Sequence, residues 1–156
     1  MHIAPSSTHA TDAEVRVRDL ISTAGGGPVV VHFWAPWCGN SRRELPAWVD
    51  FTAAHPDATV VFVTVWNDGR SGADTLAEHG LPTTGDDARI REIVQRGDGS
   101  HEDKDGRRRH FLGLPLTWIP STWIFRANGQ LAFACNYGEM DAATLGTLVE
   151  ATQQAW

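Results

Sequence analysis

Two apolar runs separated by one helix-length segment restrict the fold of this chain more than any other feature. Residues 29–34 read Val-Val-Val-His-Phe-Trp, and residues 59–66 read Thr-Val-Val-Phe-Val-Thr-Val-Trp. Apolar runs of this length, rich in β-branched residues, are typical of strands that are buried on both faces. The segment between them, from about Cys38 to Ala54, has the apolar spacing of a helix. The order strand, helix, strand predicts a parallel pair with a right-handed crossover.

The segments on either side extend this pattern. Asp12 is a plausible N-cap for a first helix, which the Gly25-Gly26-Gly27-Pro28 run ends. After the second strand, short helices are expected at Asp74–His79 and Asp86–Arg96. Residues 97–110 hold eight charged residues and three glycines, so we interpret them as a solvated loop.

The last third of the chain predicts a hairpin followed by a helix. Asn128-Gly129 separates the apolar runs Ser121–Phe125 and Leu131–Cys135, and Asn-Gly is the strongest short-range hairpin signal. Asp141 is a plausible N-cap for the final helix. The predicted fold is therefore α/β, with a mixed central sheet, an antiparallel hairpin at one edge and helices on both faces.

Length and composition narrow the class of protein further. The chain has 156 residues, which suits one domain, and we expect it at 12–156 after a flexible tail at 1–11, with a charged insertion around 68–110. A net charge of −6 argues against nucleic-acid binding. No apolar run is long enough to span a membrane, and no signal peptide is evident. The acidic residues of 97–110 lack EF-hand spacing, so we expect no metal site. We also expect no cofactor, and we expect the chain to be a monomer.

Cys38 carries the chemistry that the sequence predicts. It lies just after a buried strand and opens a helix, where backbone N–H groups and the helix dipole favour the thiolate. A thiolate is the nucleophilic form of cysteine, so Cys38 is expected to be reactive at neutral pH. Trp34 and Trp37 would flank it with flat apolar surface. The alternative is that Cys38 is a small buried hydrophobic residue, as many free cysteines are.

The residues around Cys38 resemble those of a known family. Residues 33–39, Phe-Trp-Ala-Pro-Trp-Cys-Gly, are similar to the thioredoxin active-site segment in the form found in TlpA/ResA-type thiol-disulfide proteins. Further matches are the helix-kinking proline, the segment with the cis-proline, the hairpin turn and the glycine after the last strand, here Pro46, Ile119-Pro120-Ser121-Thr122, Asn128-Gly129 and Gly138.

The resemblance implies a thioredoxin fold and a set of substrate-binding residues. In that fold the Ile119–Pro120 bond is cis and faces the cysteine, which leaves the Ile119 backbone free to pair with an extended substrate. Pro120 otherwise simply begins an edge strand. The expected substrate-binding residues are Trp37, Gly39, Ile119 and Pro120.

Two departures from the family pattern alter the expected chemistry. Ser41 stands where the family has its second cysteine, and a serine cannot resolve a mixed disulfide. Its hydroxyl would instead hydrogen-bond to the Cys38 sulfur. The sequence fits both a natural monothiol protein and a replaced resolving cysteine. His32 stands at a buried family position, where it would act as a base or hydrogen-bond partner, or be a neutral core histidine.

These residues predict a thiol-disulfide oxidoreductase in which Cys38 forms mixed disulfides that it cannot release by itself. The expected catalytic residues are Cys38, Ser41 and His32. The expected partners are protein thiols or disulfides and small thiols such as glutathione. The alternative function is a non-catalytic module that binds client proteins. The resemblance implies a periplasmic or other extracytoplasmic location with the export signal removed, and a cytoplasmic location is the alternative.

Overall fold

The computed structural model describes residues 9–24, 26–84, 89–136 and 139–154. Most of the expected tail, residues 1–8, and the expected family glycine, Gly138, lie outside these ranges. The helices are α1 (Asp12–Thr23), α2 (Gly39–Ala54), α3 (Ala73–Glu78) and α4 (Ala142–Thr152). The strands are β1 (Val29–Trp34), β2 (Thr59–Thr64), β3 (Ile90–Val94), β4 (His110–Phe111), β5 (Leu114–Pro115), β6 (Ser121–Phe125) and β7 (Leu131–Cys135).

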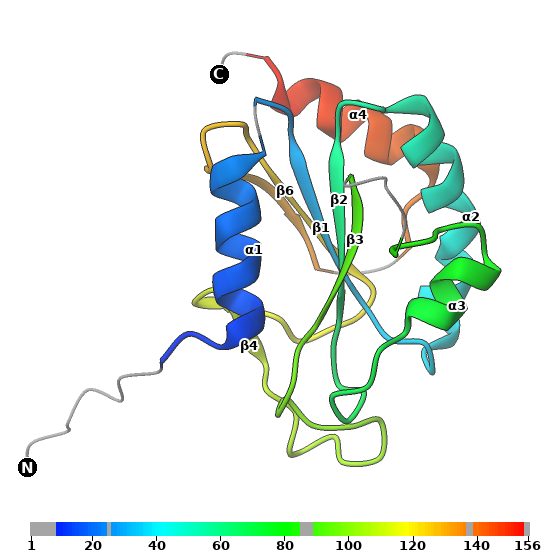
Figure 1. The fold of residues 1–156 in the computed structure, drawn as a ribbon, viewed down its shortest axis with the longest axis vertical. Coiled ribbons are helices and arrows are strands. Elements are labelled where there is room, and N and C mark those ends of the chain that lie inside the picture. The colour runs from blue at the N-terminus through cyan, green and yellow to red at the C-terminus, as the bar shows by residue number, and fades with distance from the viewer. Residues whose placement is uncertain (1–8, 25, 85–88, 137–138, 155–156) are drawn as a thin grey trace, which may run out of the picture.

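A five-stranded mixed sheet forms the centre of the molecule, in the order β3-β2-β1-β6-β7. β1 is parallel to β2, with Val29 beside Thr59, and antiparallel to β6 on its other side. Helix α1 covers one face, while α2 and α4 cover the other (Figure 1). The predicted α/β fold with a parallel centre and an antiparallel edge hairpin is confirmed.

The two apolar runs form the central strands because both of their faces are covered. All six residues of β1 are buried. Phe33 points into the core beneath α1, where its ring centre lies 4.5 Å from that of Trp123. Trp34 points to the other face and packs near Phe62. Because neither face of β1 meets solvent, its sequence does not need to alternate apolar with polar residues.

Two expectations about individual elements are wrong. Helix α1 is capped by Thr11, whose side chain accepts a hydrogen bond from the Glu14 backbone, and not by Asp12. The glutamate side chain accepts a bond from the Thr11 backbone in return, which completes a capping box.

The helix expected at Asp86–Arg96 is the second error. Residues 90–94 form β3, which pairs in parallel with β2, with Val60 beside Ile90. Ile90 and Ile93 are three residues apart, as on a helix, but the open edge of β2 offers backbone partners that a short helix lacks. Residues 86–88 lie outside the described ranges.

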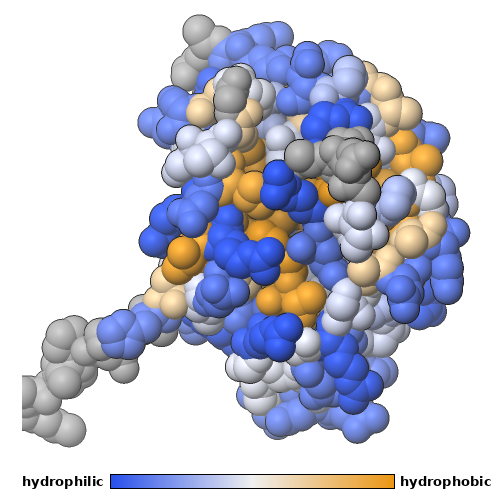
Figure 2. Space-filling view, viewed as in Figure 1, coloured by the Kyte–Doolittle hydropathy of each residue, from blue (hydrophilic) through white to orange (hydrophobic). Residues whose placement is uncertain are grey.

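The segment between β3 and β6 crosses the carboxyl ends of the parallel strands. It contains a small antiparallel pair, β4 and β5. Its charged part, residues 97–109, lies at the lower end of the view in Figure 1, and Figure 2 shows a mainly hydrophilic surface there. In the described part of the chain, no helix is both long and apolar enough to cross a membrane.

Candidate active site

Cys38 lies at the junction of β1 and α2, as the sequence predicts. It is the N-cap residue of α2, with extended backbone angles (φ −84°, ψ 116°). Its backbone N–H donates to the Ala35 carbonyl at 3.1 Å, and its own carbonyl accepts the first helical bond from Arg42. The cysteine is half-buried and free of any disulfide. The sulfur is therefore held at the positive end of a sixteen-residue helix.

The loop before β6 forms the opposite wall. The Ile119–Pro120 peptide bond is cis. The carbonyl oxygen of Ile119 lies 4.0 Å from the Cys38 sulfur, within reach of a weak S–H···O hydrogen bond. Ser121, the first residue of β6, is held by a hydrogen bond from its hydroxyl to the Trp118 carbonyl at 2.6 Å. Residues 81 positions apart in the sequence thus meet at the sulfur.

Ser41 lies in the first turn of α2, one turn beyond Cys38. Its side chain is fully buried, and its hydroxyl has no hydrogen-bond partner among the described residues. The expected hydrogen bond from this hydroxyl to the Cys38 sulfur is absent from the interactions of the described residues. Ser41 therefore occupies the position of the resolving cysteine, but its hydroxyl cannot resolve a mixed disulfide.

His32 is buried beneath α2. Its Nδ1 lies 2.9 Å from the Thr122 hydroxyl, and its Nε2 lies 3.7 Å from a carboxylate oxygen of Glu44. Burial lowers the pKa of His32 to about 3, against a smaller opposing effect of the Ser121 backbone. The imidazole is therefore neutral at physiological pH.

Glu44 is a buried acid on the same face of α2, and the sequence analysis did not identify it. Its Oε1 accepts a hydrogen bond from the Trp48 indole at 2.8 Å. Burial raises the pKa of Glu44 to about 7, although hydrogen bonds from Trp48 and the Met140 backbone oppose the shift. The signal in the sequence was a single carboxylate on the apolar stripe of a helix, between Ser41 and Trp48.

A cavity of about 260 Å³ opens beside the sulfur. Trp37, Cys38 and Ile119 line it, so the structure brings these three expected residues together. His32, Ser41, Gly39 and Pro120 are not among the described lining residues. Gly39 begins α2, and an added Cβ there would meet only the Arg43 side chain, at 3.8 Å.

The rest of the cavity wall comes from residues that sequence reasoning did not identify. Trp66 follows β2 and Trp118 precedes the cis peptide bond, and both line the cavity. The Trp37 indole donates to the Trp66 carbonyl at 3.0 Å, which joins the ends of the two parallel strands. A usable signal existed for Trp66, because sites in α/β folds form beyond the carboxyl ends of parallel strands.

Asp98 holds Trp66 in its position in the cavity wall. It is buried, and its Oδ2 accepts a hydrogen bond from the Trp66 backbone N–H at 2.8 Å. Trp66 has a positive φ of 53°, a backbone region that large side chains rarely adopt. Burial raises the pKa of Asp98 to about 6, although the Trp66 backbone opposes the shift.

Comparisons with known proteins find similarity to thioredoxins and thiol-disulfide oxidoreductases. The family model described as Thioredoxin matches residues 11–84. Sporulation thiol-disulfide oxidoreductase A of Bacillus subtilis is 42% identical over 40 residues, which are 26% of this chain and 24% of that protein. The soluble secreted antigen MPT53 of Mycobacterium tuberculosis is 26% identical over 111 residues, which are 71% of this chain and 54% of that protein.

A solved structure gives the same result for the fold. A thiol:disulfide interchange protein of the thioredoxin family from Chlorobium tepidum superposes with a TM-score of 0.61 at 18% identity, over 84% of this chain and 83% of that one. The chain has a thioredoxin fold. The local identity to the Bacillus oxidoreductase also agrees with the predicted TlpA/ResA-type resemblance. The matched stretches span only about a quarter to a half of the curated relatives' lengths.

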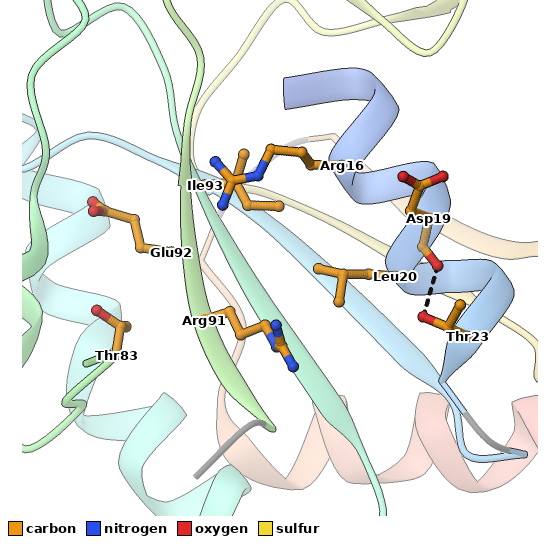
Figure 3. Close-up of a pocket in the computed structure, with 8 residues that line it drawn as sticks. All are labelled: Arg16, Asp19, Leu20, Thr23, Thr83, Arg91, Glu92 and Ile93. Carbon is orange, nitrogen blue, oxygen red and sulfur yellow. Dashed lines mark hydrogen bonds between the residues drawn. The ribbon is translucent and has the colours of Figure 1, made fainter. Parts of the chain in front are cut away.

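A larger cavity than the one beside Cys38 lies elsewhere in the described part of this thioredoxin-like chain. It measures about 360 Å³ and lies between α1 and β3, away from Cys38 (Figure 3). Its described lining includes Arg16, Asp19 and Glu92 but no cysteine and no histidine. Because its described lining contains no thiol, the smaller cavity beside Cys38 is the candidate active site for thiol chemistry.

Proposed function

We propose that this chain is a thiol-disulfide oxidoreductase of the monothiol type. The Cys38 thiolate attacks one sulfur of a disulfide RS–SR′, forms the mixed disulfide Cys38–S–S–R and expels R′S⁻. A second, external thiolate then attacks the mixed disulfide, takes R away as a new disulfide and restores the Cys38 thiolate. The observation that carries this proposal is a half-buried Cys38 at the start of α2 with the buried Ser41 hydroxyl one turn further on.

The remaining residues have supporting roles in the proposal. Ile119 presents its backbone to a substrate beside the sulfur, and Trp37 supplies an apolar contact, with Gly39 and Pro120 shaping the two ends of the site. His32 is neutral and, with Glu44, is placed to exchange protons beneath α2. We further propose protein or small-molecule thiols as partners, and a location outside the cytoplasm because a matched relative is a secreted antigen.

Cys135 does not replace the missing resolving cysteine in this proposal. It lies in the edge strand β7, opposite Thr122, and is not among the described residues of the cavity beside Cys38. Burial raises the pKa of the Cys135 thiol, so this residue remains in the protonated, less reactive form at neutral pH.

The test compares the chain with its Ser41→Cys variant, both carrying Cys135→Ala. Incubation with glutathione disulfide should add one glutathionyl group to Cys38, detected by intact mass, and the adduct should persist once free thiol is removed. In Ser41→Cys the new thiol lies one helical turn away, so it should release glutathione at least about tenfold faster.

Two further variants serve as controls. Ser41→Ala should retain the adduct as the unmodified sequence does, and Cys38→Ala should form none. An unmodified Cys38, or equal adduct lifetimes in Ser41→Cys and Ser41→Ala, would overturn the proposal. Binding of client proteins that survives in Cys38→Ala would instead favour a non-catalytic module.

A further inference from the structure

The cavity beside Cys38 is positively charged, although the chain as a whole is acidic. The cations Lys104 and Arg107 line it together with the His101 ring, and all three residues come from the segment 97–109. Lys104 is the only lysine in the sequence. The described lining includes no aspartate and no glutamate, against a net charge of −6 for the whole chain. The sign of the charge at the sulfur is therefore opposite to that of the protein.

Arg107 is fixed in place before any ligand arrives. Its guanidinium carbon lies 5.1 Å from the ring centre of Trp37 and 4.9 Å from that of Trp66. Its Nε donates to the Ser100 carbonyl and its Nη2 to the His101 carbonyl, each at 2.9 Å. A cation that is already held between two indoles loses little side-chain freedom when it binds an anion.

The segment that carries these cations is anchored on the active site. The His101 ring stacks on Trp37, with ring centres 4.1 Å apart. The Trp66 indole donates to the Arg108 carbonyl at 3.0 Å. Burial and the neighbouring charge of Arg109 lower the pKa of Arg107, while the charges of Cys38 and Asp103 oppose the shift. The Asp103 side chain, however, accepts a hydrogen bond from the Gly106 backbone.

The size of the cavity limits what it can hold. At about 260 Å³ it lies slightly below the usual range for drug-sized ligands, which is roughly 300–1,000 Å³. It suits the small organic group of a thiol compound attached to Cys38. Trp37, Trp66 and Trp118 line it and offer apolar contact to an aliphatic chain, while Lys104 and Arg107 offer positive charge to an anionic end group.

We propose that the mixed-disulfide partner of Cys38 is a low-molecular-weight thiol that bears a carboxylate, with Lys104 and Arg107 binding that carboxylate. This inference rests on the proposed function, because it names the substrate of the same sulfur. Attack by Cys38 expels one thiolate of the small disulfide and retains the other half in the cavity, with its carboxylate directed to the cations. Charge complementarity then raises the rate of encounter with anionic disulfides.

The test uses three small disulfides of matched size and different charge in a Cys135→Ala background. The probes are dithiodipropionate (anionic), bis(2-hydroxyethyl) disulfide (neutral) and cystamine (cationic). The rate of Cys38 adduct formation is followed by mass spectrometry and divided by the rate of each probe with 2-mercaptoethanol. The normalised rate for dithiodipropionate should exceed that for cystamine by about tenfold or more at low ionic strength, and the ratio should fall with added salt.

Two variants assign the preference to the named cations. Lys104→Gln and Arg107→Gln should each reduce the anionic-to-neutral rate ratio by several-fold. The matched control is Arg18→Gln, because Arg18 is an exposed cation on α1 outside the described lining of the cavity. Lys104 is exposed, so its replacement tests the charge without disturbing packing.

The outcomes separate this inference from the proposed function. Adducts with all three probes at equal normalised rates, or a preference that both variants retain, would overturn the inference and leave the proposed function intact. A chain that forms no adduct with any probe would overturn both.

Discussion

At the scale of single residues, the site combines a reactive sulfur with a buried pair of titratable groups. Glu44 and His32 face each other at 3.7 Å beneath the first turns of α2. Burial acts on the two groups in opposite directions, because it disfavours whichever form is charged. It raises the pKa of Glu44 to about 7 and lowers that of His32 to about 3. The pair is therefore largely uncharged near pH 6.

This arrangement predicts the pH dependence of stability. The folded chain holds a proton on Glu44 that the unfolded chain loses above its ordinary pKa of 4.5. The contribution of Glu44 to stability should therefore fall as the pH rises from about 4.5 through about 7. His32 acts in the opposite sense, since the unfolded chain binds its proton more readily, and its contribution should fall as the pH drops from about 6.5 towards about 3. The two contributions oppose each other between about pH 4.5 and pH 6.5, so the unmodified chain should lose stability mainly above and below that range.

Glu44→Gln separates the two contributions. The variant should lose the decline on the alkaline side and gain on the order of 2 kcal/mol over the unmodified chain at pH 8. It should keep the decline on the acidic side, which belongs to His32. Urea unfolding at pH 5, 6, 7 and 8 measures both slopes. An unchanged slope between pH 5 and pH 8 would contradict a buried, protonated Glu44.

At the scale of elements, α1 is joined to the segment after β3 by one buried carboxylate. Glu14 completes the capping box with Thr11. It also accepts a hydrogen bond from Arg108 Nη2 at 2.6 Å and one from the Leu112 backbone at 2.5 Å. Burial alone would raise the pKa of Glu14, but the hydrogen bonds from Thr11 and Leu112 lower it. One side chain therefore serves both a helix start and a distant loop.

Glu14→Gln should destabilise the chain by about 1–3 kcal/mol, because it weakens hydrogen bonds made to a buried charge. Asp12→Asn is the matched control: Asp12 is an exposed acid of the same helical turn, and its loss should cost less than about 1 kcal/mol. Urea unfolding of the two variants gives both values. A larger loss for Asp12→Asn would mean that the helix dipole, and not the capping box and the Arg108 contact, stabilises this end.

At the scale of the whole molecule, the charged segment is an addition to a sheet that does not depend on it. Its two ends are joined by a backbone hydrogen bond from Arg108 N–H to the Asp98 carbonyl at 2.9 Å. The cores on the two faces of the sheet contain no residue from 99–107. The segment thus covers the site without supporting the sheet.

Replacement of residues 99–107 by a two-residue Asn-Gly turn tests this division. The variant should fold cooperatively with a loss of about 1 kcal/mol, because it loses the contacts of Arg107 with the two indoles but closes a shorter loop. Trp37 should become more exposed, which a red shift of tryptophan fluorescence would report. Loss of the far-UV circular dichroism signal would show that the segment is part of the core.

Much of the fold and one end of the site were predictable from neighbouring residues. β1, the hairpin at Asn128-Gly129 and the position of Cys38 all follow from patterns within about ten residues of chain. Such patterns are reliable because burial on both faces and turn geometry are local requirements. The sequence did not predict β3, because its conformation depends on pairing with β2. The paired residues Val60 and Ile90 are thirty positions apart in the sequence.

The sequence by itself determined a thioredoxin-like α/β chain with a lone cysteine at a helix start and a serine in place of its partner. Only the tertiary structure decided what surrounds that cysteine. Trp66 and Arg107 line the cavity beside the sulfur from positions 28 and 69 residues further along the chain. Glu44 becomes a buried acid because the sheet and α4 enclose α2. Burial, charge and cavity shape arise from contacts between distant segments, and no local pattern encodes them.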